Sequence, residues 1–121
     1  MAELALIQAI RESLSRRPGA RVVSWLGDDA AVVRSRALAV VSVDVMVDGT
    51  HFNSARTEPA GIGHRALAGA LSDLAAMGAA AGEAYLCVVL PPALGEADVL
   101  ALHRSAGRGG SACPPPSRRR R

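Results

Sequence analysis

The sequence predicts an α/β fold of the α+β kind, with helices packed on a sheet in one small domain. Three segments repeat apolar residues at helical spacing, and runs of β-branched residues lie between them. Half of the 121 residues are hydrophobic, which is enough for a single core. Because helical and strand-like segments alternate along the chain, a layered arrangement is expected.

The first third of the chain predicts one helix and three strands. The helix spans residues 3–17, where Pro18-Gly19 ends a pattern of apolar residues: Leu4, Ile7, Ile10 and Leu14. Two short strands are expected at residues 21–26 and 30–33, on either side of the pair Asp28-Asp29. The run ALAVVSVDVMV at residues 37–47 predicts a strand buried on both faces, and Asp48-Gly49 marks the turn after it.

The second half predicts two helices separated by one strand. Residues 57–79 form a helix, with Thr57 as the candidate cap, Pro59 in the first turn and an end near Gly78. Residues 83–90 form a strand that Pro91-Pro92 stops, and residues 96–106 begin a third helix. Met46, Met77 and Cys87 are expected in the core, and His64 and His103 on the surface.

The charge is divided unevenly along the chain. Residues 1–103 carry 8 arginines against 11 acidic residues, whereas residues 104–121 carry six arginines and no acid. We therefore divide the chain into a domain at residues 1–103 and a disordered Gly/Pro/Arg tail at residues 104–121. The tail could hold nucleic acid through its arginines, but a solvated tail, or the out-of-frame ending of a truncated gene, fits this composition better.

Composition also excludes several kinds of chemistry. Lysine is absent, which removes a P-loop lysine and Schiff-base catalysis, so phosphate would be handled by metal, arginine or backbone. Trp25, Phe52 and Tyr85 are the only aromatic residues, too few for base stacking as the main activity. The two cysteines lack metal-ligand spacing and no apolar stretch is long enough to span a membrane, so we expect a cytoplasmic protein.

Carboxylates lie in or beside the predicted core elements. Ser42 and Asp44 are two residues apart on a strand, so their side chains point to the same side. Asp73 lies on a helix face of small apolar residues and needs a cation if it is buried there. Mg²⁺ is an economical partner for Asp73, Asp44 and one acid of the pair at 28–29. The alternative is that these acids cap turns and pair with arginines: Arg21, Arg34 or Arg56.

Three motifs in order resemble the amino-terminal part of thiamine-monophosphate kinases. They are GDDAAVV at 27–33, SVDVMVDGTHF at 42–52 and GHRALAGALSDLAAMGA at 63–79. The resemblance covers about residues 3–103 and implies the amino-terminal domain of the aminoimidazole ribonucleotide synthetase-like fold, with a mixed sheet. It also implies ATP-dependent phosphorylation of thiamine monophosphate to thiamine diphosphate, in which metal aligns the phosphates and no protein nucleophile is needed.

The resemblance further implies a set of site residues. Several Mg²⁺ ions would bind at five residues: Asp29, Ser42, the Val43 carbonyl, Asp44 and Asp73. His51 of GTHF would contact thiamine monophosphate, although a lone histidine there is more often a turn residue. Asp48 occupies a position that the family fills variably and receives no ligand role. Members of the superfamily pair their amino-terminal domains through a shared sheet, so a homodimer is expected.

The resemblance is also partial. Family members are about twice this length or more and carry a second Gly-Asp motif and a carboxy-terminal domain that these 121 residues lack. We therefore expect a truncated kinase domain that is impaired or inactive alone. The alternatives are another ATP-using relative, such as a selenophosphate synthetase, a hydrogenase-maturation protein or a purine-synthesis enzyme, and a non-catalytic interaction module.

Overall fold

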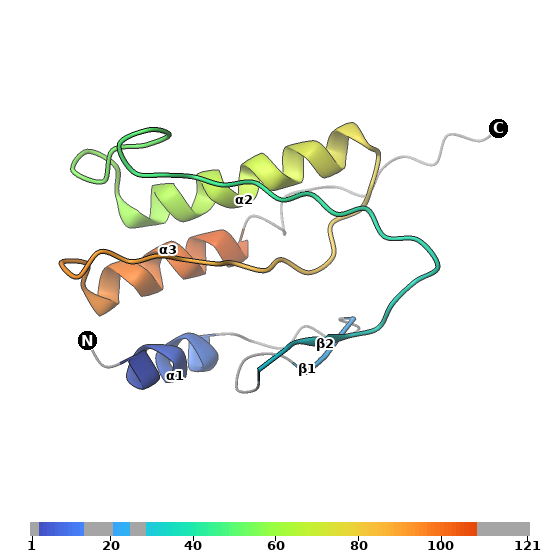
Figure 1. The fold of residues 1–121 in the computed structure, drawn as a ribbon, viewed down its shortest axis with the longest axis horizontal. Coiled ribbons are helices and arrows are strands. Elements are labelled where there is room, and N and C mark those ends of the chain that lie inside the picture. The colour runs from blue at the N-terminus through green and yellow to red at the C-terminus, as the bar shows by residue number, and fades with distance from the viewer. Residues whose placement is uncertain (1–2, 14–20, 25–28, 109–121) are drawn as a thin grey trace.

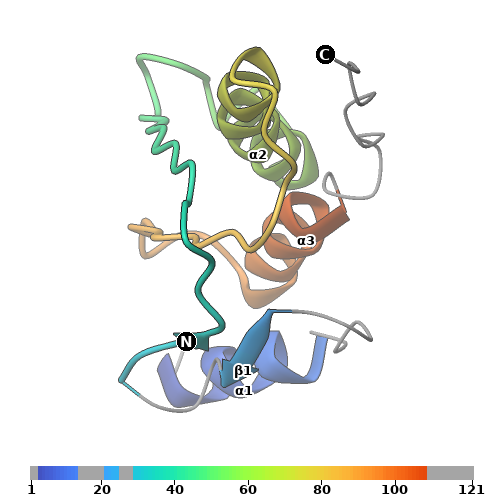
Figure 2. The same ribbon diagram turned by 90° about the vertical axis from the view of Figure 1, so that its right-hand side faces the viewer.

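The computed structural model describes residues 3–13, 21–24 and 29–108, which form three helices and one small sheet. Helices α2 (Pro59–Ala76) and α3 (Glu96–Arg108) pack side by side, as Figure 1 shows. Helix α1 (Glu3–Ser13) contacts α3 on the other side. The hairpin of β1 (Val22–Ser24) and β2 (Val32–Val33) lies on the same side of α3 as α1 (Figure 2). Three helices together with a small sheet confirm the α/β class at this coarse level.

Helix α1 follows the predicted apolar stripe. Its half-buried side chains include Leu6, Ile7 and Ile10, whereas Leu4 is 81% exposed. The helix prediction is confirmed over residues 3–13, and its remainder at 14–17 lies outside the described residues. The stripe explains why α1 rests on α3, because an isolated helix of this length is marginal in water without tertiary packing.

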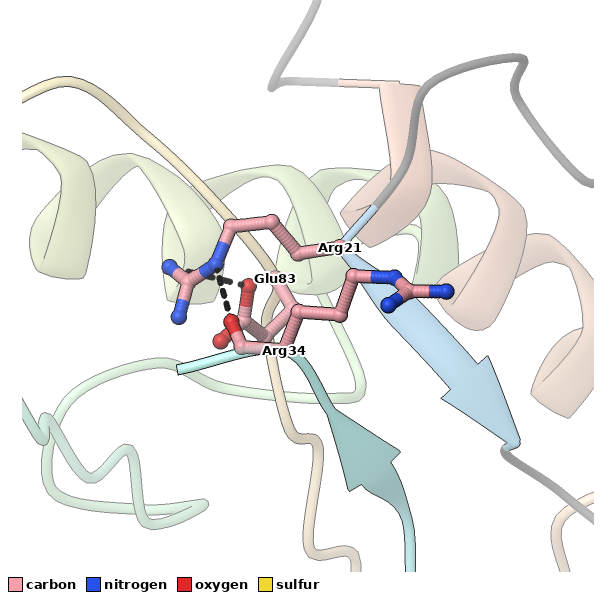
Figure 3. Close-up of polar contacts among 3 residues, drawn as sticks. All are labelled: Arg21, Arg34 and Glu83. Carbon is pink, nitrogen blue, oxygen red and sulfur yellow. Dashed lines mark hydrogen bonds and ion pairs between the residues drawn. The ribbon is translucent and has the colours of Figure 1, made fainter. Parts of the chain in front are cut away.

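Arg21 contacts both the residue that follows the second strand of the hairpin and a later segment of the chain. Strands β1 and β2 pair antiparallel, with Val22 opposite Val33. Arg21 Nε donates to the Arg34 carbonyl at 2.9 Å, and the Arg34 amide donates back to the Arg21 carbonyl at 2.9 Å. The same guanidinium lies 3.6 Å from a carboxylate oxygen of Glu83, which follows α2 (Figure 3). Arg21 thus links the hairpin to the chain beyond α2.

The ends of α2 follow from proline and glycine. Pro59 occupies the first turn, where its missing N–H costs nothing, and the preceding Glu58 is the cap residue without a side-chain cap hydrogen bond. The predicted cap at Thr57 is therefore wrong by one residue. At the other end Gly78 has φ +65°, and the amides of Gly78 and Ala79 donate to the carbonyls of Ala75 and Leu74. These two bonds are a Schellman motif, which confirms the end predicted near Gly78.

The core lies where α2 crosses α3. Val99 and Leu102 of α3 are 3% and 8% exposed, and Gly63 of α2 is buried against them. A Cβ placed on Gly63 would overlap the backbone carbonyl of Leu102. Glycine at this position therefore lets the two helix backbones approach closely.

Two of the predicted strands are wrong. Residues 37–47 and 83–90 are extended but unpaired among the described residues, whose sheet is antiparallel rather than mixed. Val43 is 88% exposed and Val89 95%, so neither segment is buried on both faces. The apolar pattern indicates where a strand can form, but a strand also needs a neighbour that accepts its backbone hydrogen bonds.

Three smaller expectations also fail. Cys87 and Met77 are exposed, because they lie in the unpaired segment and at the C-cap of α2. His103 is half-buried in α3, and its Nδ1 is buried without a hydrogen-bond partner. Helix α3 also continues to Arg108, five residues into the range assigned to the tail, and residues 109–121 lie outside the described chain.

Candidate functional site

The segment at residues 37–47 runs along α2 (Figure 1) and turns one polar side chain onto that helix. The hydroxyl of Ser42 donates a hydrogen bond to Oδ2 of Asp73, with an oxygen–oxygen distance of 2.8 Å. Thirty-one residues separate the two in sequence. Extended backbone before α2 and the last turn of that helix therefore meet at this contact.

Asp44 lies against the same face of α2. A Cβ added to Gly69 would overlap Oδ2 of Asp44, so the carboxylate occupies the space that a side chain at residue 69 would fill. Gly69 and Asp73 are four residues apart and share one helix face. Oδ1 of Asp44 accepts the amide of Val45 at 2.7 Å. The geometry thus brings Ser42, Asp44 and Asp73 to one face, as the two-residue alternation of an extended chain requires.

These acids are exposed, which corrects the sequence-based expectation of buried carboxylates. Asp44 and Asp73 both keep much of their surface in water. A hydrated carboxylate needs no counter-cation for the fold to be stable. The contact that the structure gives Asp73 is the Ser42 hydroxyl, and Arg21 pairs with Glu83 instead.

The two remaining expected metal ligands are Asp29 and the Val43 carbonyl. Asp29 is exposed in a bend, and Asp28 lies outside the described residues. Val43 is 88% exposed and alternates with Ser42 and Asp44, which point toward α2. Among residues 3–13, 21–24 and 29–108, no three His, Cys, Asp or Glu side chains lie close enough together to hold a metal ion. The ligand roles of Asp29 and Val43 stay predictions.

His51 lies in a tight loop directly after the extended segment. Its Nδ1 accepts the amide of Val47 at 3.0 Å, and its own amide donates to the Val47 carbonyl at 2.9 Å. Arg65 of α2 donates to the His51 carbonyl at 3.3 Å. His51 therefore has a local role in holding this turn, and its ring is exposed at the surface. Contact between His51 and thiamine monophosphate stays a prediction.

Asp48 and Ser54 are the residues of this loop that sequence reasoning left without a role. Oδ1 of Asp48 accepts the amides of Gly49 and Ser54 at 2.9 Å each, and Oδ2 accepts the Ser54 hydroxyl. The Ser54 hydroxyl and amide together lower the pKa of the Asp48 carboxyl. The sequence pattern that could have predicted this arrangement is Asp48-Gly49 followed by Ser54. Aspartate side chains often accept hydrogen bonds from nearby backbone amides in turns.

The donor set on the face of α2 has the chemistry that Mg²⁺ prefers. Two carboxylates and a hydroxyl are hard oxygen ligands, and Mg²⁺ commonly binds one or two protein carboxylates while keeping several waters. The space over Gly69, which a larger side chain would occupy, is where the Asp44 oxygen lies. The donor types present therefore fit a partly hydrated Mg²⁺ ion.

Comparison with known families assigns the fold. Residues 27–113 match the family model described as AIR synthase related protein, N-terminal domain. That match covers most of the chain, including Ser42, Asp44, His51 and Asp73. The chain belongs to this family.

The relatives that the chain matches include three thiamine-monophosphate kinases. It is 54% identical over 67 residues to a thiamine-monophosphate kinase of Synechococcus elongatus, covering 54% of this chain and 20% of that protein. It is 34% identical over 80 residues to the thiamine-monophosphate kinase of Bacillus subtilis, covering 64% and 25%, respectively. For that of Corynebacterium glutamicum the identity is 40% over 68 residues, covering 54% and 20%.

The resemblance to the amino-terminal part of thiamine-monophosphate kinases is therefore confirmed. The chain spans only about a fifth to a quarter of the length of these relatives. No solved structure matches it. In the described part of the chain, no helix combines the length and the apolar character needed to cross a bilayer.

Proposed function

We propose that this chain supplies the amino-terminal part of an ATP-dependent kinase that phosphorylates thiamine monophosphate to thiamine diphosphate. The observation that supports the proposal most directly is the Ser42–Asp73 hydrogen bond beside Asp44, on a face of α2. The proposed substrate is inferred from the relatives, which are thiamine-monophosphate kinases. Thiamine monophosphate and ATP are therefore the proposed partners. We also propose a homodimer and a cytoplasmic location.

Each residue of the site has a distinct proposed role. Asp44 and Asp73 would hold Mg²⁺, with Asp29 and the Val43 carbonyl as further ligands. Ser42 fixes the carboxylate of Asp73 by its hydrogen bond and offers its own oxygen to the same face. Mg²⁺, when bound, neutralises phosphate charge and aligns the donor and acceptor phosphates. His51 would contact thiamine monophosphate from the neighbouring loop.

Binding tests this proposal more sharply than turnover does. Because the chain spans a quarter or less of the matched kinases, we expect little or no thiamine diphosphate from the chain with Mg²⁺-ATP and thiamine monophosphate. Isothermal titration with thiamine monophosphate should instead show binding that requires Mg²⁺. The variant Asp73→Asn should lose that Mg²⁺ dependence, because the amide removes one negative ligand. Asp98→Asn, which changes an exposed acid at the start of α3, is the matched control.

Two outcomes would contradict the proposal. If thiamine monophosphate binds with equal affinity with and without Mg²⁺, the metal takes no part in this site. Absence of any binding of thiamine monophosphate or ATP would favour the non-catalytic interaction module, an alternative that the short span of the match supports. Efficient formation of thiamine diphosphate would show that catalysis does not need the parts of the relatives that this chain does not match.

A further inference from the structure

The loop at residues 47–54 is closed by hydrogen bonds on its own backbone. The Gly49 amide donates to the Phe52 carbonyl at 2.8 Å, and the His51 amide donates to the Val47 carbonyl at 2.9 Å. Gly49 has φ +78°, a conformation that glycine adopts without steric cost. The chain therefore forms a closed turn between Val47 and Phe52, with a parallel bridge between Asp48 and Phe52.

The carboxylate of Asp48 joins the two ends of this loop. It accepts the amide of Gly49 at the start, and both the amide and the hydroxyl of Ser54 at the end. Three donors on one carboxylate favour its ionised form, and the Ser54 hydroxyl has the largest effect in lowering its pKa. Because Asp48 is exposed, this role does not depend on burial in the core.

The closed loop also determines which nitrogen of His51 carries the proton. Nδ1 accepts the Val47 amide at 3.0 Å, so it cannot carry a proton in this arrangement. The neutral ring must then be protonated at Nε2, which is a hydrogen-bond donor. Arg65 holds the His51 carbonyl toward α2, so the backbone of the histidine is fixed from a second direction.

We propose that Asp48 is a positioning residue that, through the loop at residues 47–54, fixes His51 in the Nε2–H form and presents that donor to an oxygen of a phosphate monoester. This inference rests on the proposed function, because the monoester is the proposed substrate, thiamine monophosphate. Asp48 itself contacts neither substrate nor metal in this account. It acts by holding the loop that carries the donor.

The first arm of the test measures the His51 ring directly on the full chain. In nitrogen-15 NMR spectra, the native chain should show a protonated Nε2, an unprotonated Nδ1 and a scalar coupling between Nδ1 and the Val47 amide nitrogen. The variant Asp48→Ala should lose the coupling and show a mixture of ring forms. Asp48→Asn should keep both features, because its amide oxygen can still accept the amides of Gly49 and Ser54.

The matched control lies in the same loop. Asn53 accepts the Ala55 amide at 2.9 Å through its side chain, a hydrogen bond that involves neither Asp48 nor His51. Asn53→Ala should therefore leave the His51 ring signals unchanged. If Asp48→Ala leaves them unchanged as well, or if Asn53→Ala disturbs them equally, Asp48 has no specific positioning role and the proposal is wrong.

The second arm links the loop to the ligand. Titration with thiamine monophosphate should give an affinity weaker by about tenfold for Asp48→Ala, the lower end of what loss of a supporting hydrogen-bond shell costs. Asp48→Asn should stay close to the native chain. If the native chain binds no thiamine monophosphate, the proposed function fails while the first arm still decides whether Asp48 controls the histidine. An unchanged affinity in Asp48→Ala would overturn the link to the substrate.

Discussion

Ser42 and Asp73 are joined by a hydrogen bond of 2.8 Å between the extended segment that precedes α2 and the last turn of that helix. Both residues are partly or largely exposed to water, so the contact adds little to stability and mainly fixes the carboxylate. Asp44 lies one helical turn away, over Gly69. Two carboxylates held on one exposed face are the basis of the proposed metal site.

Gly63→Ala should destabilise the domain. The added Cβ would overlap backbone atoms of Leu102, which cannot move without separating α2 from α3. Overpacking of this kind costs about 1–3 kcal/mol. Urea unfolding followed by helix circular dichroism should show the lower midpoint. An unchanged midpoint would mean that the two helices are not in close contact at this crossing.

Gly69→Ala should have the opposite effect on stability, although it lies in the same helix. The atom in the way is the Asp44 carboxylate oxygen, the end of an exposed and flexible side chain that can move aside. Alanine in a helix interior is more favourable than glycine by about 0.5–1 kcal/mol. We therefore expect a slightly higher unfolding midpoint together with weaker Mg²⁺ binding, because Asp44 is displaced. A lower unfolding midpoint would mean that the Asp44 side chain cannot move away from residue 69.

His103 predicts a dependence of stability on pH. Burial, and to a smaller extent the charge of Arg104, lowers the pKa of His103 below its ordinary value of 6.5. The unfolded chain therefore binds this proton more readily than the folded chain. Stability should be fully present above pH 6.5 and should fall as the pH decreases through the folded pKa. The fall should be absent in His103→Gln, measured by denaturant titration between pH 5 and 8. A native chain whose midpoint does not change over this range would show that the ring is accessible to water.

The three helices could be predicted from sequence because their signals are local. Apolar spacing predicts α1 and α3, and Pro59 and Gly78 bracket α2 with an error of one or two residues. The extended segments at 37–47 and 83–90 are different, because whether they become strands depends on a neighbour that the local pattern does not specify. Their alternation still predicted that Ser42 and Asp44 share one side.

The candidate site was predictable only in part. Spacing on an extended chain placed Ser42 and Asp44 on one side, and helix periodicity placed Asp73 on a face of small residues. Neither pattern predicted that the acids are exposed. The glycine over which Asp44 lies, and the hydrogen bonds of Asp48, depend on how the segments approach one another in space. Asp29 shows most clearly what sequence motifs leave undetermined. The order of the motifs predicts that Asp29, Asp44 and Asp73 share one metal site, but the described residues contain no cluster of three metal-binding side chains.

Paramagnetic titration of the full chain tests the central claim most directly, that Asp44 and Asp73 form one metal-binding face. Mn²⁺ replaces Mg²⁺ at carboxylate sites and broadens the NMR signals of nuclei close to it. We predict that the amides around Ser42, Asp44, Gly69 and Asp73 broaden together at low Mn²⁺ concentration, that Mg²⁺ reverses the effect, and that Asp73→Asn abolishes it while Asp98→Asn does not. Broadening that starts elsewhere, or that persists unchanged in Asp73→Asn, would contradict the account.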